Sequence, residues 1–167
     1  MVRRIRVVFT ESVNFSLPVV QAFTLHRNGP HSATAGPDAN VGLTASPAIG
    51  PTNSVILTFS GPVIDSTFSL IDGVYDFTID ASKISGLAGN LNGSGSGVGT
   101  NYTVVGNTAN KWYRFFGDGN GDGAVDQTDY LAFRNALSGG PKSVFNIGGG
   151  ISQSDYLEFR KRLAGAP

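Results

Sequence analysis

From Val2 to about Val105 the chain alternates apolar and polar side chains with a period of two, the pattern of strands that bury one face. Clusters of Gly, Pro, Asn and Ser interrupt the alternation and mark turns, one of them at Asp72 and Gly73. We therefore expect strands over Val2–Thr10, Ala22–Arg27, Val41–Ala45, Ser54–Phe59, Val74–Ile79 and Asn101–Val105. Short strands at this spacing predict an antiparallel β-sandwich over residues 1–110.

Beyond residue 110 the apolar spacing becomes helical, and the pattern occurs twice. The segment from Gln127 to Gly139 aligns with that from Gln153 to Gly165 at an offset of 26 residues, with eight of thirteen positions identical. One helix face in each copy would carry Tyr130, Phe133 and Leu137, or Tyr156, Phe159 and Leu163. With Asp126 and Ser152 as N-caps, residues 111–167 are predicted to form a small α domain of two antiparallel helices packed through those faces.

A twelve-residue loop from Asp118 to Asp129 precedes the first helix. Oxygen-bearing side chains occupy loop positions 1, 3, 5, 9 and 12, with Gly123 at position 6 and Val125 at position 8. Calcium takes about six to eight oxygens, and this spacing offers one at nearly every second residue around a glycine corner. A solvated turn rich in Asp, Asn and Gly is the alternative, but it leaves the apolar and final acidic positions unexplained. We expect one Ca²⁺, bound by Asp118, Asn120, Asp122, the Ala124 carbonyl, Asp126 through water and both oxygens of Asp129.

The loop before the second helix has lost most of these ligands. Counting back from Asp155 at position 12 places Val144, Asn146, Gly148, Gly149, Ile151 and Ser152 at positions 1, 3, 5, 6, 8 and 9. Only one carboxylate is left, while the apolar anchor is retained. We therefore expect the second repeat to hold no calcium and to keep its shape by packing.

The first loop, its Asp at the final position and the duplicated short helices resemble the dockerin type I module, a tandem of EF-hand-like repeats that lack the entering helix. The resemblance covers about Gly117 to Gly165 and is weaker in the second repeat, where the family normally binds another calcium ion. The preceding stretch, including the segments around Leu57 and Tyr75, resembles the immunoglobulin-like modules that precede such tails in large secreted bacterial proteins.

Dockerins bind cohesin domains through exposed helix positions, so the resemblance implies a cohesin-like protein partner. By motif position the contact residues would be Gln127, Thr128, Arg134 and Asn135 in the first copy, and Gln153, Ser154, Arg160 and Lys161 in the second. An ordinary solvated helix face is the alternative reading of these eight residues. The degenerate second loop also puts in question the family's interchangeable use of its two halves.

Two further segments admit more than one interpretation. The aromatic stretch Lys111–Phe116 is expected to form the interface between sandwich and tail, with a sugar-stacking platform at Trp112 and Tyr113 as the alternative. The stretch Asn90–Gly97 alternates oxygen-bearing residues with Gly. Because it carries no carboxylate, we read it as a flexible loop in preference to a calcium site.

Composition excludes several classes of protein. The 167 residues carry 12 Lys plus Arg against 12 Asp plus Glu, so no net charge attracts nucleic acid or an acidic membrane, and there is no Cys. No apolar run approaches the roughly 20 residues of a membrane span. His26 and His31 are the only histidines, and no nucleophile or phosphate-binding motif is present. Four acids that might serve a glycosidase, Asp65, Asp72, Asp76 and Asp80, have the density of any half-exposed sandwich edge. We therefore expect no catalytic residues and no enzyme.

These observations predict a non-catalytic, calcium-binding module of a longer exported or cell-surface protein, whose export signal would lie upstream and whose tail mediates assembly or attachment. A carbohydrate-binding accessory domain is the alternative, as is a spacer with only a structural calcium ion.

Overall fold

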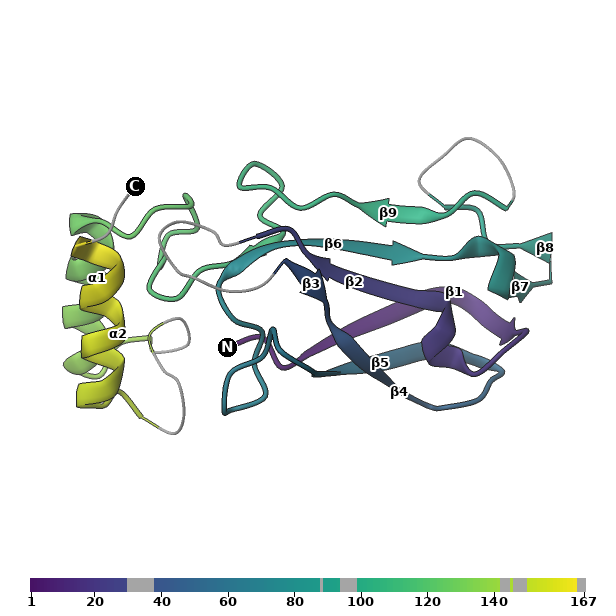
Figure 1. The fold of residues 1–167 in the computed structure, drawn as a ribbon, viewed down its shortest axis with the longest axis horizontal. Helices are drawn as coiled ribbons and strands as arrows, with labels where there is room; N and C mark the ends of the chain where they lie inside the picture. The colour runs from purple at the N-terminus through teal and green to yellow at the C-terminus, as the bar shows by residue number, and fades with distance from the viewer. Residues whose placement is uncertain (30–37, 88, 94–98, 142–144, 146–149, 165–167) are drawn as a thin grey trace.

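The computed structural model describes residues 1–29, 38–87, 89–93, 99–141, 145 and 150–164. Over these residues the chain is mainly antiparallel β structure with two helices, which stand together beyond one end of the sheets (Figure 1). The predicted combination of a mainly β part and a small α part is therefore confirmed. Within the described residues, neither helix is long and apolar enough to cross a lipid bilayer.

The first sheet follows the strand order β4–β5–β1–β7–β8. Its strands are β1 (Arg4–Phe15), β4 (Gly42–Ser46), β5 (Thr52–Ser60), β7 (Ile84–Gly86) and β8 (Gly89–Asn90). β5 pairs with β1 over most of its length, whereas β7 pairs only with Asn14 and Phe15 at its far end. Among the described residues, the first half of β1 thus has a strand on one side only.

The second sheet follows the order β10–β6–β2–β3, with β9 also paired to β6. Its strands are β2 (Phe23–Arg27), β3 (Ala39–Asn40), β6 (Gly73–Ile79), β9 (Tyr102–Val104) and β10 (Tyr113–Arg114). β9 and β10 pair with the end and the start of β6, so they follow one another along its edge. Two short 3₁₀ helices, η1 (Val19–Ala22) and η2 (Ala81–Lys83), connect strands of the two sheets.

One apolar core lies between the two sheets and explains the alternation in the sequence. The faces predicted to be shared are buried: Val55, Leu57 and Phe59 on β5, and Tyr75, Phe77 and Ile79 on β6. Phe23 of β2 stacks on the ring of Phe77 with their centroids 6.2 Å apart. Because both sheets bury their inner residues in this cluster, the arrangement is like that of a sandwich.

The strand boundaries differ from the prediction in identifiable places. The first strand begins at Arg4 and continues to Phe15, well past the predicted end at Thr10, because β7 supplies a second partner for its last two residues. Val41 is buried but precedes β4, and β9 is shorter than the predicted strand. Strands β3, β7, β8 and β10 were not predicted, because segments of two or three residues have no periodicity to read.

The helices α1 (Gln127–Leu137) and α2 (Gln153–Ala164) begin where the repeat predicts. Asp126 caps α1, and its side chain and that of Asp129 form a reciprocal capping box. The two helices pack through stacked rings of Phe133 and Phe159, with centroids 4.9 Å apart. Tyr130 contacts Phe159 while Phe133 contacts Tyr156, so the helices run antiparallel, as expected.

One predicted contact of the helix interface is wrong. Leu137 is 57% exposed, although its spacing places it with Tyr130 and Phe133. Leu137 is the last residue of α1, where the partner helix no longer covers the face. Phe145, from the segment between the helices, instead packs edge-on against Phe133 at 5.4 Å and helps to fill the small core.

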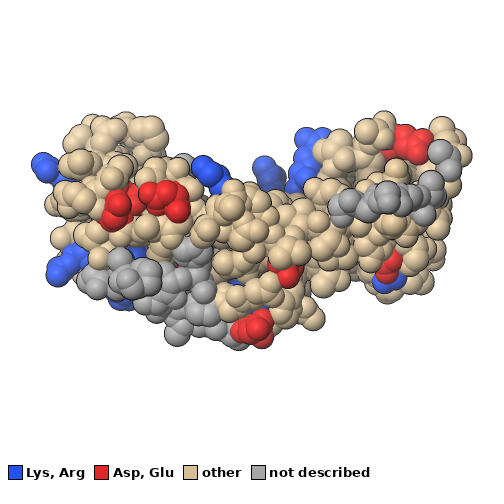
Figure 2. Space-filling view, turned by 90° about the horizontal axis from the view of Figure 1, so that it is seen from above, with Lys and Arg blue, Asp and Glu red and all other residues tan. Residues whose placement is uncertain are grey.

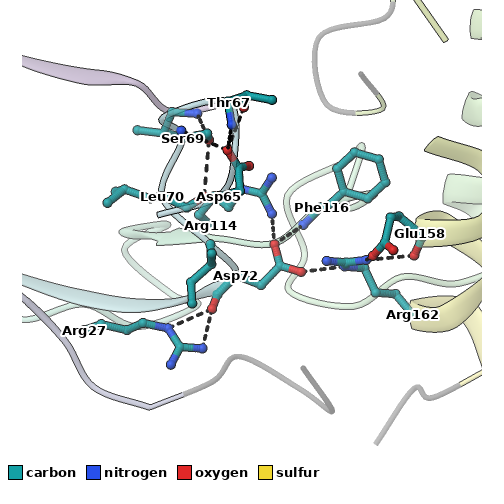
Figure 3. A network of polar contacts seen from close by, with 12 residues as sticks. Arg27, Asp65, Thr67, Ser69, Leu70, Asp72, Arg114, Phe116, Glu158 and Arg162 are labelled. Carbon is teal, nitrogen blue, oxygen red and sulfur yellow. Dashed lines mark hydrogen bonds and ion pairs between the residues drawn. The ribbon is translucent and has the colours of Figure 1, made fainter. Parts of the chain in front are cut away.

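A buried ion-pair network joins the sheets to the helices (Figure 3). Asp72, only 2% exposed, pairs with Arg114 of β10 and with Arg162 of α2, and it accepts the backbone N–H of Phe116 at 2.9 Å. Burial, with the neighbouring cation of Arg162, lowers the pKa of Arg114 to about 10, which still leaves it charged at neutral pH. Removing one member of such a network costs about 3–5 kcal/mol, because it leaves a buried charge without its partner.

The aromatic segment after residue 110 is divided between the two cores. Trp112 packs against the sandwich core, whereas Phe115 and Phe116 belong to the core between the helices. Tyr113 and Arg114 form β10, so residues that we assigned to the tail complete an edge of the second sheet. The segment therefore connects the two parts through both backbone pairing and side-chain packing.

Candidate metal site

The acidic loop lies between β10 and α1 and is fixed at both ends by buried side chains. Phe116 and Val125, 4% and 1% exposed, anchor it in the helical core, as expected of the apolar position 8. Gly123, at the predicted corner, has a φ of 89°, which favours glycine. Gly117 has a φ of 94°, and a Cβ there would lie 2.8 Å from the ring of Phe159. The loop thus turns tightly against the helices.

Three carboxylates converge inside this loop. One oxygen each from Asp118, Asp122 and Asp129 lies within 4.8 Å of the others. Asp118 and Asp129 are buried, and Asp122 is exposed, so the cluster opens toward solvent on one side. Two oxygens on opposite sides of one calcium ion are about 4.6–5.2 Å apart, so the spacing fits a cation of that size. Three negative charges at this distance repel one another unless a cation lies between them.

Backbone N–H groups and one hydroxyl hold the two buried carboxylates in place. Asp118 accepts hydrogen bonds from Gly121 N–H at 2.6 Å, Gly123 N–H at 3.0 Å and the Tyr113 hydroxyl at 2.5 Å. Asp129 accepts from the N–H groups of Gly119 at 2.7 Å and Asp126 at 2.9 Å. Hydrogen bonds within the loop and from Tyr113 therefore position the two buried carboxylates.

The remaining predicted ligands surround this cluster in different ways. The Asn120 amide donates to Asp122 at 2.7 Å, and its oxygen accepts from Asp122 N–H at 2.9 Å, so Asn120 lies beside the cluster. Asp122 accepts the Ala124 N–H at 2.9 Å. The Asp126 carboxylate caps α1 by accepting Thr128 N–H at 2.7 Å and is not one of the three converging groups.

The electrostatics of the site follow from burial. Burial raises the pKa of Asp129, partly offset by the N–H groups of Asp126 and Gly119. Burial, reinforced by the hydrogen bond to Asp118, raises the pKa of the Tyr113 hydroxyl, which therefore stays a donor at neutral pH. The N–H of Ala124 lowers the pKa of the exposed Asp122. The cluster accordingly holds carboxylates with different affinities for protons, and a cation would compete with a proton mainly at Asp129.

Tyr113 is a residue of this site that the sequence analysis did not assign to it. It comes from β10, so its hydroxyl ties the loop to the edge of the second sheet. In the sequence, Tyr113 stands five residues before Asp118. This position alone does not distinguish a residue of the loop from one in a packed linker or a sugar platform. The ring of Trp112 is half-buried against Phe77, with centroids 6.1 Å apart. Tyr113 is likewise half-buried.

The second repeat shares the helix start but not the acidic cluster. Asp155, 1% exposed, accepts from the Ser152 N–H at 2.7 Å and from its hydroxyl at 2.5 Å. This reproduces the contact of Asp129 with Asp126 N–H. The predicted positions Val144, Asn146, Gly148 and Gly149 lie outside the described residues, as do residues 94–97 of the stretch Asn90–Gly97.

The eight predicted partner-binding residues all lie exposed on the helices: Gln127, Thr128, Arg134, Asn135, Gln153, Ser154, Arg160 and Lys161. Two exposed leucines that the sequence analysis did not include stand among them. Leu131 is 55% exposed and Leu157 is 49% exposed, and they occupy equivalent positions of the two copies. In the sequence they are recognisable as an apolar residue that recurs at the same position of both repeats, outside the helix face formed by the aromatic residues.

The other acids and the described histidine have structural partners. Asp65 accepts from Thr67 and Ser69, Asp76 from Gly106 N–H, and Asp80 from Ser82. His26 contacts Asn40 and Asp38, and His31 lies outside the described residues. No family model, curated protein or solved structure matches the chain.

Proposed function

We propose that residues 111–167 form a dockerin-like calcium-binding attachment module of an exported protein, carried by a non-catalytic, immunoglobulin-like sandwich. The observation that carries the proposal is the convergence of oxygens from Asp118, Asp122 and Asp129 within 4.8 Å. A turn needs no such group of mutually repelling charges, whereas a cation site does.

Calcium is the ion that the donor set favours. All side chains in the cluster offer oxygen, which suits calcium and magnesium better than zinc, whose protein sites typically include histidine nitrogen or cysteine sulfur. Magnesium demands a near-ideal octahedron at about 2.0–2.1 Å, whereas calcium accepts irregular loops at about 2.3–2.6 Å. Because extracellular calcium is plentiful, a dissociation constant of only about 10⁻⁴ M would keep such a site filled outside the cell.

Isothermal titration of the full chain with CaCl₂ and then with MgCl₂ tests the ion. We expect one calcium ion per chain, a weaker response to magnesium, and no calcium uptake by Asp118→Ala. Asp38→Asn is the matched control, because Asp38 is an exposed aspartate that contacts His26 and is not one of the three converging groups. Absence of any calcium heat, or uptake by Asp118→Ala equal to that of the wild type, would refute the proposed ion site.

The attachment surface is proposed to be the exposed face that contains Leu131 and Leu157 together with the polar residues around them. Each helix exposes one leucine beside polar side chains, Leu131 near Arg134 and Asn135, and Leu157 near Arg160 and Lys161. Protein interfaces likewise combine apolar residues with a polar rim. A pull-down from the secreted fraction of the source organism, with calcium and then with chelator, tests this role. We expect bands that require calcium and that are lost with Leu131→Arg plus Leu157→Arg. Bands unaffected by both chelator and these changes would argue against a calcium-ordered attachment surface.

A further inference from the structure

Among the described residues, one edge of the first half of β1 has no paired strand, and this edge borders a groove. Five consecutive residues, Ile5 to Phe9, line this groove of about 370 Å³. Side chains on a strand alternate between faces, so a groove against one face would contact every second residue. Contact with consecutive residues therefore means that the groove runs along the edge of the strand. Among the described residues, no strand pairs with this edge before Asn14.

The opposite wall of the groove is apolar and contains an unsatisfied donor. It is formed by inner-face residues of β6 and β9 and by neighbouring side chains: Phe77, Ile79, Leu91, Tyr102, Val104 and Trp112. The indole N–H of Trp112 is buried and has no hydrogen-bond acceptor in the part of the chain that the structure describes. Because Trp112 lines the groove, a ligand bound there would change the surroundings of its indole ring.

The outer face beside this edge is cationic. Arg4 and Arg6 are exposed and point away from the core, on the face opposite to Ile5 and Val7. Within the described residues, no carboxylate pairs with Arg3, Arg4 or Arg6, and Arg6 donates only to the Ser54 hydroxyl, at 3.0 Å. Figure 2 shows several Lys and Arg side chains along the hollow between the helical part and the sheets, and others at the outer edge of the helical part.

We propose that the free edge of β1 binds an extended strand of a partner protein in which acidic residues alternate with apolar ones. The partner's backbone pairs with β1, its apolar side chains enter the groove, and its acids lie beside Arg4 and Arg6 as cross-strand neighbours. A second copy of this chain would instead bring the same arginines to the edge, so charge favours an acidic partner.

Trp112 is the only tryptophan of the chain and provides the readout. The probe is a synthetic ten-residue peptide that alternates Glu with Val, added to the full chain in calcium buffer. We expect a saturable shift of tryptophan emission. A peptide of the same sequence, N-methylated at alternate residues, keeps the side chains but cannot complete the backbone ladder, so its binding should be lost. An unchanged emission spectrum, or equal binding of the methylated peptide, would overturn the proposal.

Charge variants complete the test. Reversing both arginines, Arg4→Glu with Arg6→Glu, should weaken the peptide about tenfold, since two favourable cross-strand pairs become unfavourable. Arg134→Glu with Arg160→Glu is the matched control, with the same change of charge on the exposed helices. If both double variants weakened binding of the peptide equally, the effect would be due to general charge attraction, and the proposal would be contradicted. Sedimentation showing a dimer of the wild type that the β1 variant abolishes would assign the edge to a second copy instead.

Discussion

The two repeats of the helical part begin their helices in the same way but carry different loops. In both, a buried aspartate accepts a backbone N–H three residues earlier, Asp129 from Asp126 at 2.9 Å and Asp155 from Ser152 at 2.7 Å. Only the first loop adds the carboxylates of Asp118 and Asp122 beside that aspartate. The second repeat therefore indicates that an N-cap and a packed aromatic face are sufficient for the helix to begin. The extra acids of the first repeat need another explanation, and we propose that it is a bound cation.

The largest expected effect comes from removing what the repeats share. Phe159 is fully buried and stacks on Phe133 across the helix pair. Phe159→Ala should cost about 3–5 kcal/mol of the free energy of unfolding, because it leaves a cavity at the centre of a small core. Denaturant unfolding followed by far-ultraviolet circular dichroism checks this. An unchanged free energy of unfolding of the helices would mean that this aromatic core does not stabilise the two repeats.

Substituting the equivalent aspartates of the two repeats tests whether only the first repeat binds calcium. Asp129→Ala and Asp155→Ala should each cost about 1–3 kcal/mol without calcium, because both remove a buried carboxylate that accepts N–H groups before its helix. At a calcium concentration of 100 times the dissociation constant, only the Asp155 variant should regain about 2.7 kcal/mol from binding. Thermal unfolding with calcium and with chelator measures the difference. Equal responses of the two variants to calcium would erase the proposed distinction between the loops.

The pH dependence of the free energy of unfolding gives a further test of the acidic loop in the first repeat. Burial raises the pKa of Asp129 above its ordinary 3.8, so the folded state binds its proton more tightly than the unfolded state. Without divalent cations, the contribution of Asp129 to stability is therefore greatest below pH 3.8 and is lost as the pH rises through the raised value. The wild type should lose stability relative to Asp129→Asn across this window. Calcium, which binds the ionised form, should reduce this loss and bind more weakly as the pH falls.

The smallest effect on stability is expected at the exposed helix positions. Arg134→Ala and Arg160→Ala occupy equivalent places in the two repeats and should each change the free energy of unfolding by less than about 0.5 kcal/mol. If the two repeats were used interchangeably, each variant alone would weaken partner capture only slightly and the double variant strongly. Loss of capture with one of them alone would show that the repeats differ in partner binding as they do in their loops.

The sequence predicted those features that local patterns determine. Alternation located β5 and β6 within a residue or two, and the repeat located both helices. The spacing of acids around Gly123 indicated a cluster, and the structure brings three of those carboxylates together. The exposed Leu137 shows the limit of periodicity, since a helix face continues in sequence beyond the end of the partner that covers it.

Features that depend on distant segments could not be predicted. The Asp72 ion pairs join residues 42 and 90 positions apart, and the sequence offered only a turn at that site. The Tyr113 hydroxyl reaches Asp118 because β10 pairs with β6, a contact without periodicity. The groove beside β1 likewise exists because β7 is too short to cover that edge, which no single strand pattern reveals.

The central claim is that one cation lies among Asp118, Asp122 and Asp129 and orders the loop before α1. A crystal structure grown with ample calcium tests it most directly. The account predicts one ion coordinated by oxygens of these three aspartates at about 2.3–2.6 Å, with none in the loop before α2. Only water among the three carboxylates, or calcium bound solely in the second repeat, would contradict it.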